Sequence, residues 1–105
     1  MNFEKVRKRY IPMSETMFYV LLSLREVRHG YAIMQYVKDL TNGRINLGAG
    51  TVYSSIGKLE GDGLIKPVSE ENRRKTYQIT EPGSDILCEE ARRIAELHRS
   101  AEVLL

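Results

Sequence analysis

Apolar residues recur at helical spacing near the start of the chain. One stripe has the i, i+3, i+4, i+7 order of a single helical face: Met17, Val20, Leu21 and Leu24. The stripe predicts a helix over residues 13–27, and Ser14 stands where its N-cap belongs. Phe18 and Leu22 broaden the apolar surface enough to favour burial on two sides, by the chain itself and by a partner.

A second apolar stripe follows the His29-Gly30 break. Its residues are Ile33, Val37 and Leu40, and they predict a helix over residues 31–40 with these side chains turned inward. Thr41-Asn42-Gly43 has the composition of a turn. The alternating triplet 45–47 predicts one short strand.

The stretch 47–65 predicts a third helix with two different faces. Val52, Ile56 and Leu59 lie on one face at spacings of four and three. The opposite face holds small hydroxyls and one cation: Thr51, Ser54, Ser55 and Lys58. Such side chains can reach base edges and phosphates in a DNA major groove while the backbone stays close. An ordinary solvated helix explains this stretch alone equally well.

Glycines stand both inside and after this third helix. Gly61 and Gly63 predict its end. Gly50 and Gly57 fall within it, where each costs roughly 1 kcal/mol relative to alanine. Close approach of another surface to the backbone would account for that cost, and DNA is the obvious surface.

Two short alternating runs predict a hairpin directly after the third helix. Residues 64–69 form one strand, with Pro67 marking an edge position, and residues 75–79 form the other. The loop between them is charged and brings three cations to its tip: Arg73, Arg74 and Lys75. A solvated hairpin tip is the usual meaning of such a run. Its place after a helix-turn-helix favours a wing that neutralises phosphates.

The last segment has a heptad pattern. Thr80 caps a predicted helix with Glu81 and Pro82 in its first turn. Apolar and small residues, with one histidine among them, then recur at alternating spacings of four and three: Leu87, Ala91, Ile94, His98, Ala101 and Leu105. We expect this seam to pair with a second copy of the chain, together with Phe18 and Leu21 of the first helix.

The net charge of +2 conceals an uneven distribution. Residues 1–79 hold 13 Lys/Arg against 8 Asp/Glu, whereas residues 80–105 hold 3 against 6. Four cations near the N-terminus predict a basic arm that lies along a phosphate backbone or enters a minor groove: Lys5, Arg7, Lys8 and Arg9. A frayed, solvated terminus is the alternative.

The composition offers little chemistry. His29 and His98 lie on different elements without a carboxylate pattern, so we expect no metal site and no cofactor. Cys88 is the only cysteine, which suits a reducing cytoplasm. The location we expect is a bacterial-type cytoplasm, in association with the nucleoid. We expect no signal peptide, no membrane span and no enzyme, because no acid/base or nucleophile set assembles.

Four segments resemble the PadR family of bacterial transcriptional repressors. They are HGYAIMQYVKDLTNG (29–43), GTVYSSIGKLEGDGLI (50–65), RRKTYQIT (73–80) and TEPG (80–83). They cover about two thirds of the chain in the family's order. The single C-terminal helix resembles the small subgroup that includes regulators of multidrug efflux pumps.

The resemblance implies a dimeric winged-helix repressor that binds a palindromic operator and is released by a small molecule. It matches Tyr53 to the family's DNA-contacting tyrosine, Lys58 to a basic position of the recognition helix, and residues 73–75 to the basic wing. Efflux-type members place a tryptophan in the drug-binding pore. This chain has none, and Phe3, Tyr10 and Phe18 are its candidate substitutes.

The predicted fold is mainly α with a small β-wing, of the α+β class. Residues 1–80 form a winged helix-turn-helix domain that binds double-stranded DNA, and residues 81–105 form a dimerisation helix packed on it. The predicted protein is a homodimeric repressor released by a small aromatic inducer. The rival hypotheses are a winged-helix protein-interaction module without DNA affinity, and a DNA-binding regulator without a ligand.

Overall fold

The computed structural model describes residues 2–105, so Met1 of the predicted domain lies outside the described residues. The elements follow one another in this order: α1 (Phe3–Tyr10), α2 (Glu15–Ser23), β1 (Arg28–His29), α3 (Gly30–Leu40), α4 (Ala49–Gly61), β2 (Ile65–Glu71), β3 (Arg74–Ile79), α5 (Glu81–Ala101) and a 3₁₀ turn, η1 (Glu102–Leu104). The strands form an antiparallel sheet in the order β1-β3-β2. The α+β prediction with a small hairpin is confirmed.

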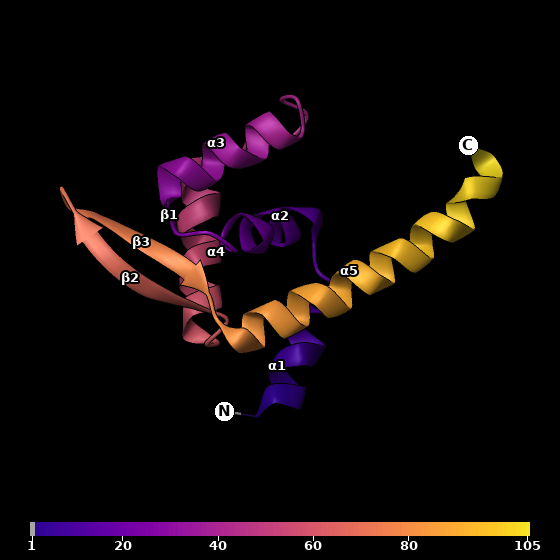
Figure 1. Cartoon of the computed structure of the whole chain (residues 1–105), viewed down its shortest axis with the longest axis horizontal. Helices are drawn as coiled ribbons and strands as arrows, with labels where there is room; N and C mark the ends of the chain where they lie inside the picture. Colours follow the sequence, from indigo (N-terminus) through magenta and orange to yellow (C-terminus); the bar gives the residue numbers. More distant parts are fainter. Residues whose placement is uncertain (1) are drawn as a thin grey trace.

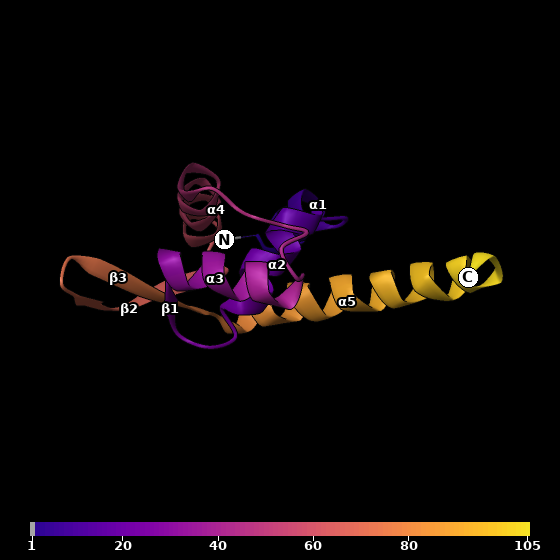
Figure 2. The same ribbon diagram turned by 90° about the horizontal axis from the view of Figure 1, so that it is seen from above.

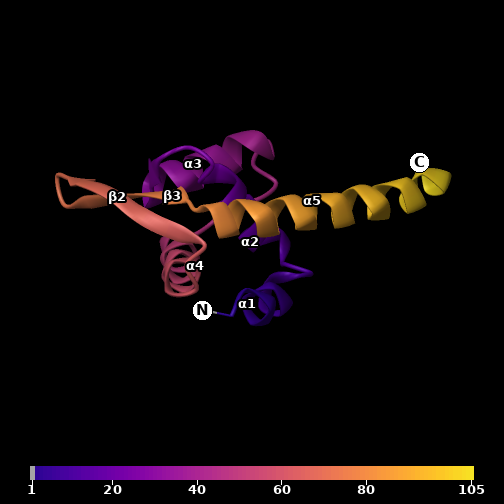
Figure 3. The same cartoon turned by 60° about the horizontal axis from the view of Figure 1, so that its bottom comes forward.

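The molecule is elongated, with principal extents of 50 × 36 × 20 Å. Helices α2, α3 and α4 form the body, the β2–β3 hairpin leaves it on one side, and α5 runs out on the other (Figure 1). Seen from above, α4 and α1 stand away from the plane that holds the hairpin and α5 (Figure 2). Figure 3 brings this side forward and shows the two helices on one face of the molecule.

The core lies where the inward faces of the helices meet the sheet. Both predicted stripes enter it, because Val20, Leu21 and Leu24 of the first and Ile33 and Val37 of the second are buried. The inner row of α4 joins them, as do Leu64 just before β2 and residues from the strands and the last helix: Ile65, Tyr77, Ile86 and Leu87. Within residues 2–105, no helix has the length and apolarity needed to cross a membrane.

The predicted N-caps of α2 and α5 and the predicted glycine end of α4 are confirmed. Ser14 accepts a hydrogen bond from the Met17 backbone N–H (3.1 Å), and Thr80 accepts one from the Gly83 N–H (3.2 Å). At the end of α4, Gly63 adopts φ +76°, which a residue without a Cβ tolerates best. Pro67 lies on β2, an edge strand, as predicted.

The start of α5 is locked to the end of α4. The Thr80 hydroxyl donates to the Gly63 carbonyl at 2.7 Å, and the Thr80 N–H donates to the Leu64 carbonyl at 3.0 Å. Gly83 packs so tightly here that a Cβ would lie 2.1 Å from the Leu64 oxygen. The orientation of α5 on the body is therefore set within its first turn.

Three details differ from the sequence-based expectation. Leu40 was predicted inward but is 51% exposed, because α3 ends there and its last turn extends past the core. Residues 45–47 form no strand, because no neighbouring strand pairs with them and the Thr41 hydroxyl instead binds the Ile45 N–H at 3.1 Å. Helix α2 is shorter than the helix predicted over residues 13–27, and it is followed by β1, which pairs with β3.

The predicted basic arm is a helix. Asn2 caps α1 through the Lys5 N–H (3.3 Å), and Val6 and Tyr10 are buried one turn apart. The arm prediction was wrong because it weighed the four cations and overlooked this i, i+4 apolar pair, which is sufficient to fix a short helix against the body.

Candidate nucleic-acid interface

The two faces of α4 differ in accessibility. Val52, Ile56 and Leu59 are buried, whereas the opposite side is exposed and is referred to below as the outer face: Gly50, Thr51, Ser54, Gly57 and Lys58. Ser55 is 7% exposed, so its prediction as a groove-facing residue was wrong. It follows Val52 by three positions and precedes Leu59 by four, which turns it toward the core.

The glycines of the outer face lie in open space. An added Cβ at Gly50 or Gly57 would meet no atom within 4 Å. Neither glycine adopts a positive φ. Neither intramolecular packing nor backbone conformation therefore requires glycine at these positions, and the backbone of α4 lies open along this face.

The N-terminus of α4 differs from those of the other α-helices. Asn2, Ser14, His29 and Thr80 cap α1, α2, α3 and α5 through side-chain acceptors. The N-cap of α4 is Gly48, which has no side chain to offer, and no acidic residue stands in the first turn. The first N–H groups of α4 and its positive dipole end are thus available to an external anion.

Tyr53 stands at the edge of the outer face and is 56% exposed. Its ring covers the backbone of Gly30 at the start of α3, where an added Cβ would lie 2.7 Å from the phenol oxygen. Burial raises the pKa of the nearby Tyr77, and Glu60 and Tyr53 raise it further. Tyr53 therefore occupies the junction between α4, α3 and the sheet.

The β2–β3 hairpin closes with a two-residue turn, shorter than the predicted charged loop. Asn72 and Arg73 have φ values of +51° and +65°, as a type I′ turn requires. Asparagine tolerates this left-handed region, but the second position strongly favours glycine. An arginine there is conformationally unfavourable.

The register of the hairpin distributes its charges unevenly. Glu71 faces Arg74 and Glu70 faces Lys75 across the strands, so two of the three predicted wing cations have an acidic neighbour. Arg73 sits in the turn, outside these cross-strand pairs. All three side chains are exposed, and Arg73 is the one that carries the net positive charge at the tip.

Two of the four cations of α1 bind within the chain. The Arg7 guanidinium contacts Glu89 of α5 at 2.7 and 2.9 Å, and Arg9 contacts Asp62 at 2.6 Å. The contact with Arg7 lowers the pKa of Glu89. Lys5 and Lys8 remain exposed. Of the four cations predicted to bind DNA, Lys5 and Lys8 therefore take no part in these two internal ion pairs.

The end of α4 rests on Tyr10, a contact that the sequence analysis missed. The Tyr10 hydroxyl donates to the Asp62 carboxylate at 2.7 Å, and the Lys58 ammonium lies 5.2 Å from the Tyr10 ring centre. Burial, followed by the bond to Asp62, raises the pKa of Tyr10. The i, i+4 spacing of Val6 and Tyr10 was the only available signal of this contact.

The predicted dimer residues divide into two groups. Leu21 and Leu87 are buried in the chain's own core, so they cannot line an external surface. Phe18 is half-buried, and the C-terminal part of the seam is largely open to solvent: Ala91, Ile94, His98, Ala101 and Leu105. Leu97 beside it is 60% exposed. The seam therefore packs in the chain's own core at the start of α5 and faces solvent farther along the helix.

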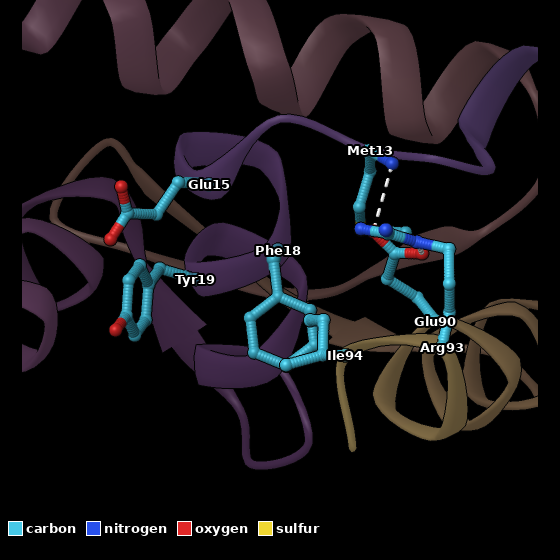
Figure 4. A pocket seen from close by; sticks show the side chains of 7 residues that line it. All are labelled: Met13, Glu15, Phe18, Tyr19, Glu90, Arg93 and Ile94. Carbon is cyan, nitrogen blue, oxygen red and sulfur yellow. Dashed lines mark hydrogen bonds and ion pairs between the residues drawn. The ribbon is translucent and has the colours of Figure 1, made fainter. Parts of the chain in front are cut away.

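A pocket of about 280 Å³ opens between α2 and α5, beside the half-buried Phe18. It is lined by Met13, Glu15, Phe18, Tyr19, Glu90, Arg93 and Ile94. Figure 4 shows the Phe18 ring pointing toward Ile94, with Glu90 bound to the backbone of Met13. Arg93 bonds to Glu90 at 2.7 and 2.9 Å and lowers the pKa of this buried carboxyl group.

Across residues 2–105, no three His, Cys, Asp or Glu side chains are grouped so that they could hold a metal ion. The arrangement instead consists of α3, a turn, α4 and a two-stranded hairpin, which defines a winged helix-turn-helix protein. The family described as "Transcriptional regulator PadR-like family" matches residues 19–89. The chain belongs to this family of transcriptional regulators.

Individual relatives agree with the family assignment. A 37.1 kDa protein of a Streptomyces fradiae transposon is 33% identical over 69 residues, which are 66% of this chain and 19% of that protein. The transcriptional regulator YqjI of Escherichia coli K12 is 30% identical over 92 residues, which are 87% of this chain and 44% of the relative. The chain thus spans less than half the length of either protein.

A solved structure extends the likeness to nearly the whole chain. The PadR family transcriptional regulator of Eggerthella lenta superposes with a TM-score of 0.69 at 27% identity, covering 96% of this chain and 86% of that one. The resemblance to the PadR family is therefore confirmed, and it includes both the winged helix and α5.

Proposed function

We propose that the chain is a transcriptional repressor that binds a palindromic DNA operator as a homodimer and is released by a small aromatic molecule. The observation that carries the DNA-binding part is the outer face of α4. Its small residues, open backbone and uncapped N-terminus suit close approach to a polyanion in a major groove. Thr51, Tyr53, Ser54 and Lys58 are the groups that would contact bases or phosphates there.

The hairpin supplies the flanking phosphate contacts in this proposal. Arg73 stands at its tip with Arg74 and Lys75 beside it. Placing arginine at a turn position that favours glycine costs stability, which is understandable if the guanidinium has an external anion to bind. Lys5 and Lys8 on α1 extend the cationic surface.

The exposed part of α5 supports the homodimer. Ile94 and Leu97 of α5 and Leu104 of the η1 turn that follows it are exposed. Apolar residues gathered on one helix are stabilised by burial against a like surface, and two-fold pairing is the commonest way to achieve this. Two winged helices joined in this way would face two half-sites of a palindrome.

The pocket between α2 and α5 is where we place the inducer. Phe18, Tyr19 and Ile94 offer apolar and aromatic surface, and α5 belongs to the proposed dimer arm. A ligand bound there would act on the spacing of the two DNA-reading helices. Planar aromatic compounds should raise the melting temperature of the wild type by binding the folded state. Phe18→Ala should weaken that shift, and equal shifts in both proteins would contradict this placement.

Replacing Arg73 with glycine tests the DNA-binding function directly. Glycine suits the turn, so the folded hairpin should persist while each subunit of the dimer loses one phosphate contact. We expect affinity for a promoter fragment from the neighbouring genes to fall about tenfold. The salt slope in log K against log salt should shrink by about 1.8, because the dimer loses two phosphate contacts worth about 0.9 each.

Val68→Gly provides a matched hairpin control, since it changes an exposed apolar residue of β2 and no charge. Its salt slope should equal that of the wild type. If the wild type binds no DNA even at low salt, the winged helix is a protein-interaction module instead. If it binds with a slope that Arg73→Gly leaves unchanged, the wing does not hold phosphate.

A further inference from the structure

We propose that Gly30 is a positioning residue for Tyr53, keeping the phenol at the DNA-facing edge of α4 by leaving room for its ring. This inference rests on the proposed DNA-binding function. Gly30 itself would touch no DNA. Its contribution is the absence of a side chain at the one place where the ring of Tyr53 meets the backbone of α3.

The contact is too close for any other residue in the same arrangement. A Cβ on Gly30 would lie 2.7 Å from both the Cζ and the Oη of Tyr53, and 3.0 Å from its Cε1. Carbon atoms in contact are ordinarily about 3.5–4.0 Å apart. A methyl group at position 30 would therefore displace the ring of Tyr53.

No other property of position 30 calls for glycine. Its φ is not in the left-handed region, where Gly43 and Gly63 are the glycines observed. It is the first residue of α3, and glycine is a poor helix former. The three nearest atoms to an added Cβ all belong to Tyr53, so the ring accounts for the glycine.

The backbone beneath the Tyr53 ring is fixed by two interactions of the neighbouring residue His29. The His29 Nδ1 accepts a hydrogen bond from the Ala32 N–H at 3.2 Å, which fixes the first turn of α3. His29 also pairs with Thr76 of β3, which ties this point to the hairpin. The backbone at Gly30 is thus anchored, and the ring would have to move if the two clashed.

The ring has space to move because it is only half covered. Tyr53 is 56% exposed, so much of its side chain faces solvent. In our inference, the packing of its ring on Gly30 orients the phenol. A clash at the far end of a side chain is relieved by rotation, so Gly30→Ala should preserve the fold and misplace the phenol.

The test is a double-mutant cycle in DNA affinity between Gly30→Ala and Tyr53→Ala, measured by fluorescence anisotropy on the same promoter fragment. We expect Gly30→Ala alone to weaken binding about tenfold. In the Tyr53→Ala background the same change should have no effect, because there is no ring to displace. Gly57→Ala in both backgrounds is the matched control, since its added Cβ would meet no atom within 4 Å, Tyr53 included, and its effect should be the same in each.

A second readout does not depend on DNA. In protein labelled with 3-fluorotyrosine, the ¹⁹F resonance assigned through Tyr53→Phe should shift in Gly30→Ala, while those of the remote tyrosines stay in place. If Gly30→Ala lowers the melting temperature, adding Tyr53→Ala should restore it, because the closest contacts of the new Cβ are all with this ring. A loss that persists in the double variant would overturn the inference.

The outcomes distinguish a failure of the positioning role of Gly30 from a failure of the proposed DNA-binding function. If the Arg73→Gly variant binds DNA less tightly but Gly30→Ala binds like the wild type, the positioning role is wrong and the DNA-binding function stands. Equal effects of Gly30→Ala with and without Tyr53 lead to the same conclusion. If the wild type binds no DNA, the function fails, and an unshifted ¹⁹F resonance would then overturn the geometric inference as well.

Discussion

Helices α4 and α5 each expose one face, and the two faces differ in chemistry. The outer face of α4 holds glycine, serine, threonine and one lysine beside an open backbone. The distal part of α5 and the η1 turn after it expose large apolar side chains instead: Ile94, Leu97 and Leu104. Both helices are anchored in the same core, so this difference is not a consequence of the fold.

We infer from this difference that the two faces meet two kinds of partner. Small polar residues let a hydrated, charged surface approach closely, whereas large apolar residues gain free energy only when another apolar surface removes them from water. In our proposal α4 meets DNA and α5 meets a second copy of the chain. Each face can be altered by one substitution while the other remains intact, which makes the comparison testable.

The largest effect should come from Gly83→Ala, which breaks the anchor of α5. The new Cβ would lie 2.1 Å from the Leu64 carbonyl oxygen and 2.9 Å from Ile79 Cγ1. Backbone cannot rotate away as a side chain can, so α5 must shift from the body. We expect the free energy of unfolding to fall by about 3 kcal/mol in urea denaturation, at the upper end of overpacking costs.

Gly61→Ala is the control for this substitution. An added Cβ there meets no atom within 4 Å, so stability should be unchanged or slightly higher. A Gly83→Ala variant as stable as Gly61→Ala would show that the first turn of α5 is not locked to the end of α4.

The next effect concerns the apolar face of α5. Leu97→Glu would place a charge in the proposed dimer contact, and a two-fold interface carries the change twice. Since burying an unpaired charge is costly, we expect the dimer dissociation constant to rise on the order of a hundredfold in sedimentation experiments. Ser100→Glu, which adds the same charge on the same helix outside the predicted seam, should leave the dimer intact. An unchanged dimer in Leu97→Glu would place the interface elsewhere.

A smaller effect on stability is expected at Glu90, a buried residue of α5. Its carboxylate binds the Met13 N–H at 2.9 Å and the Arg93 side chain, and Arg93 lowers its pKa. A depressed folded-state pKa gives stability that is present above the unfolded value near 4.3 and is lost as pH falls through the folded value.

Glu90→Gln should therefore lower the free energy of unfolding by about 1–2 kcal/mol at pH 7, since it removes the charge from these hydrogen bonds. The difference from the wild type should shrink as pH falls below about 4. Urea denaturation at several pH values measures it. The same loss at pH 3 and pH 7 would mean that packing, rather than the carboxylate charge, explains the effect.

The sequence predicted α4 well and α1 poorly, for a physical reason. The three inner residues of α4 recur at helical spacing over three turns, so local pattern and tertiary burial agree. In α1 the charges are the conspicuous feature, and whether Arg7 and Arg9 are free depends on Glu89 and Asp62, 82 and 53 positions away. Pairing at such separation leaves no local periodicity to detect.

The same reasoning explains which residues of the candidate site were predicted correctly. Thr51, Ser54 and Lys58 were correctly placed outside, because a helix fixes their direction relative to Val52. Ser55 was misplaced because it lies at the border of the two faces, where depth is decided by the neighbouring helix. The contact between Tyr53 and Gly30 joins two helices, so the residue spacing within either helix could not predict it.

The smallest expected effect tests the open backbone of α4. Gly57→Ala should stabilise the fold by about 0.5–1 kcal/mol, because alanine is the better helix former and its Cβ meets nothing within 4 Å. In our proposal the same methyl group points at DNA, so affinity should fall severalfold while the melting temperature rises by a few degrees. Stability and binding would then move in opposite directions, which a general loosening or tightening of the fold cannot produce. Tighter DNA binding by this variant would mean that the groove does not approach the backbone at residue 57, and that the glycine is explained neither by the chain nor by its proposed partner.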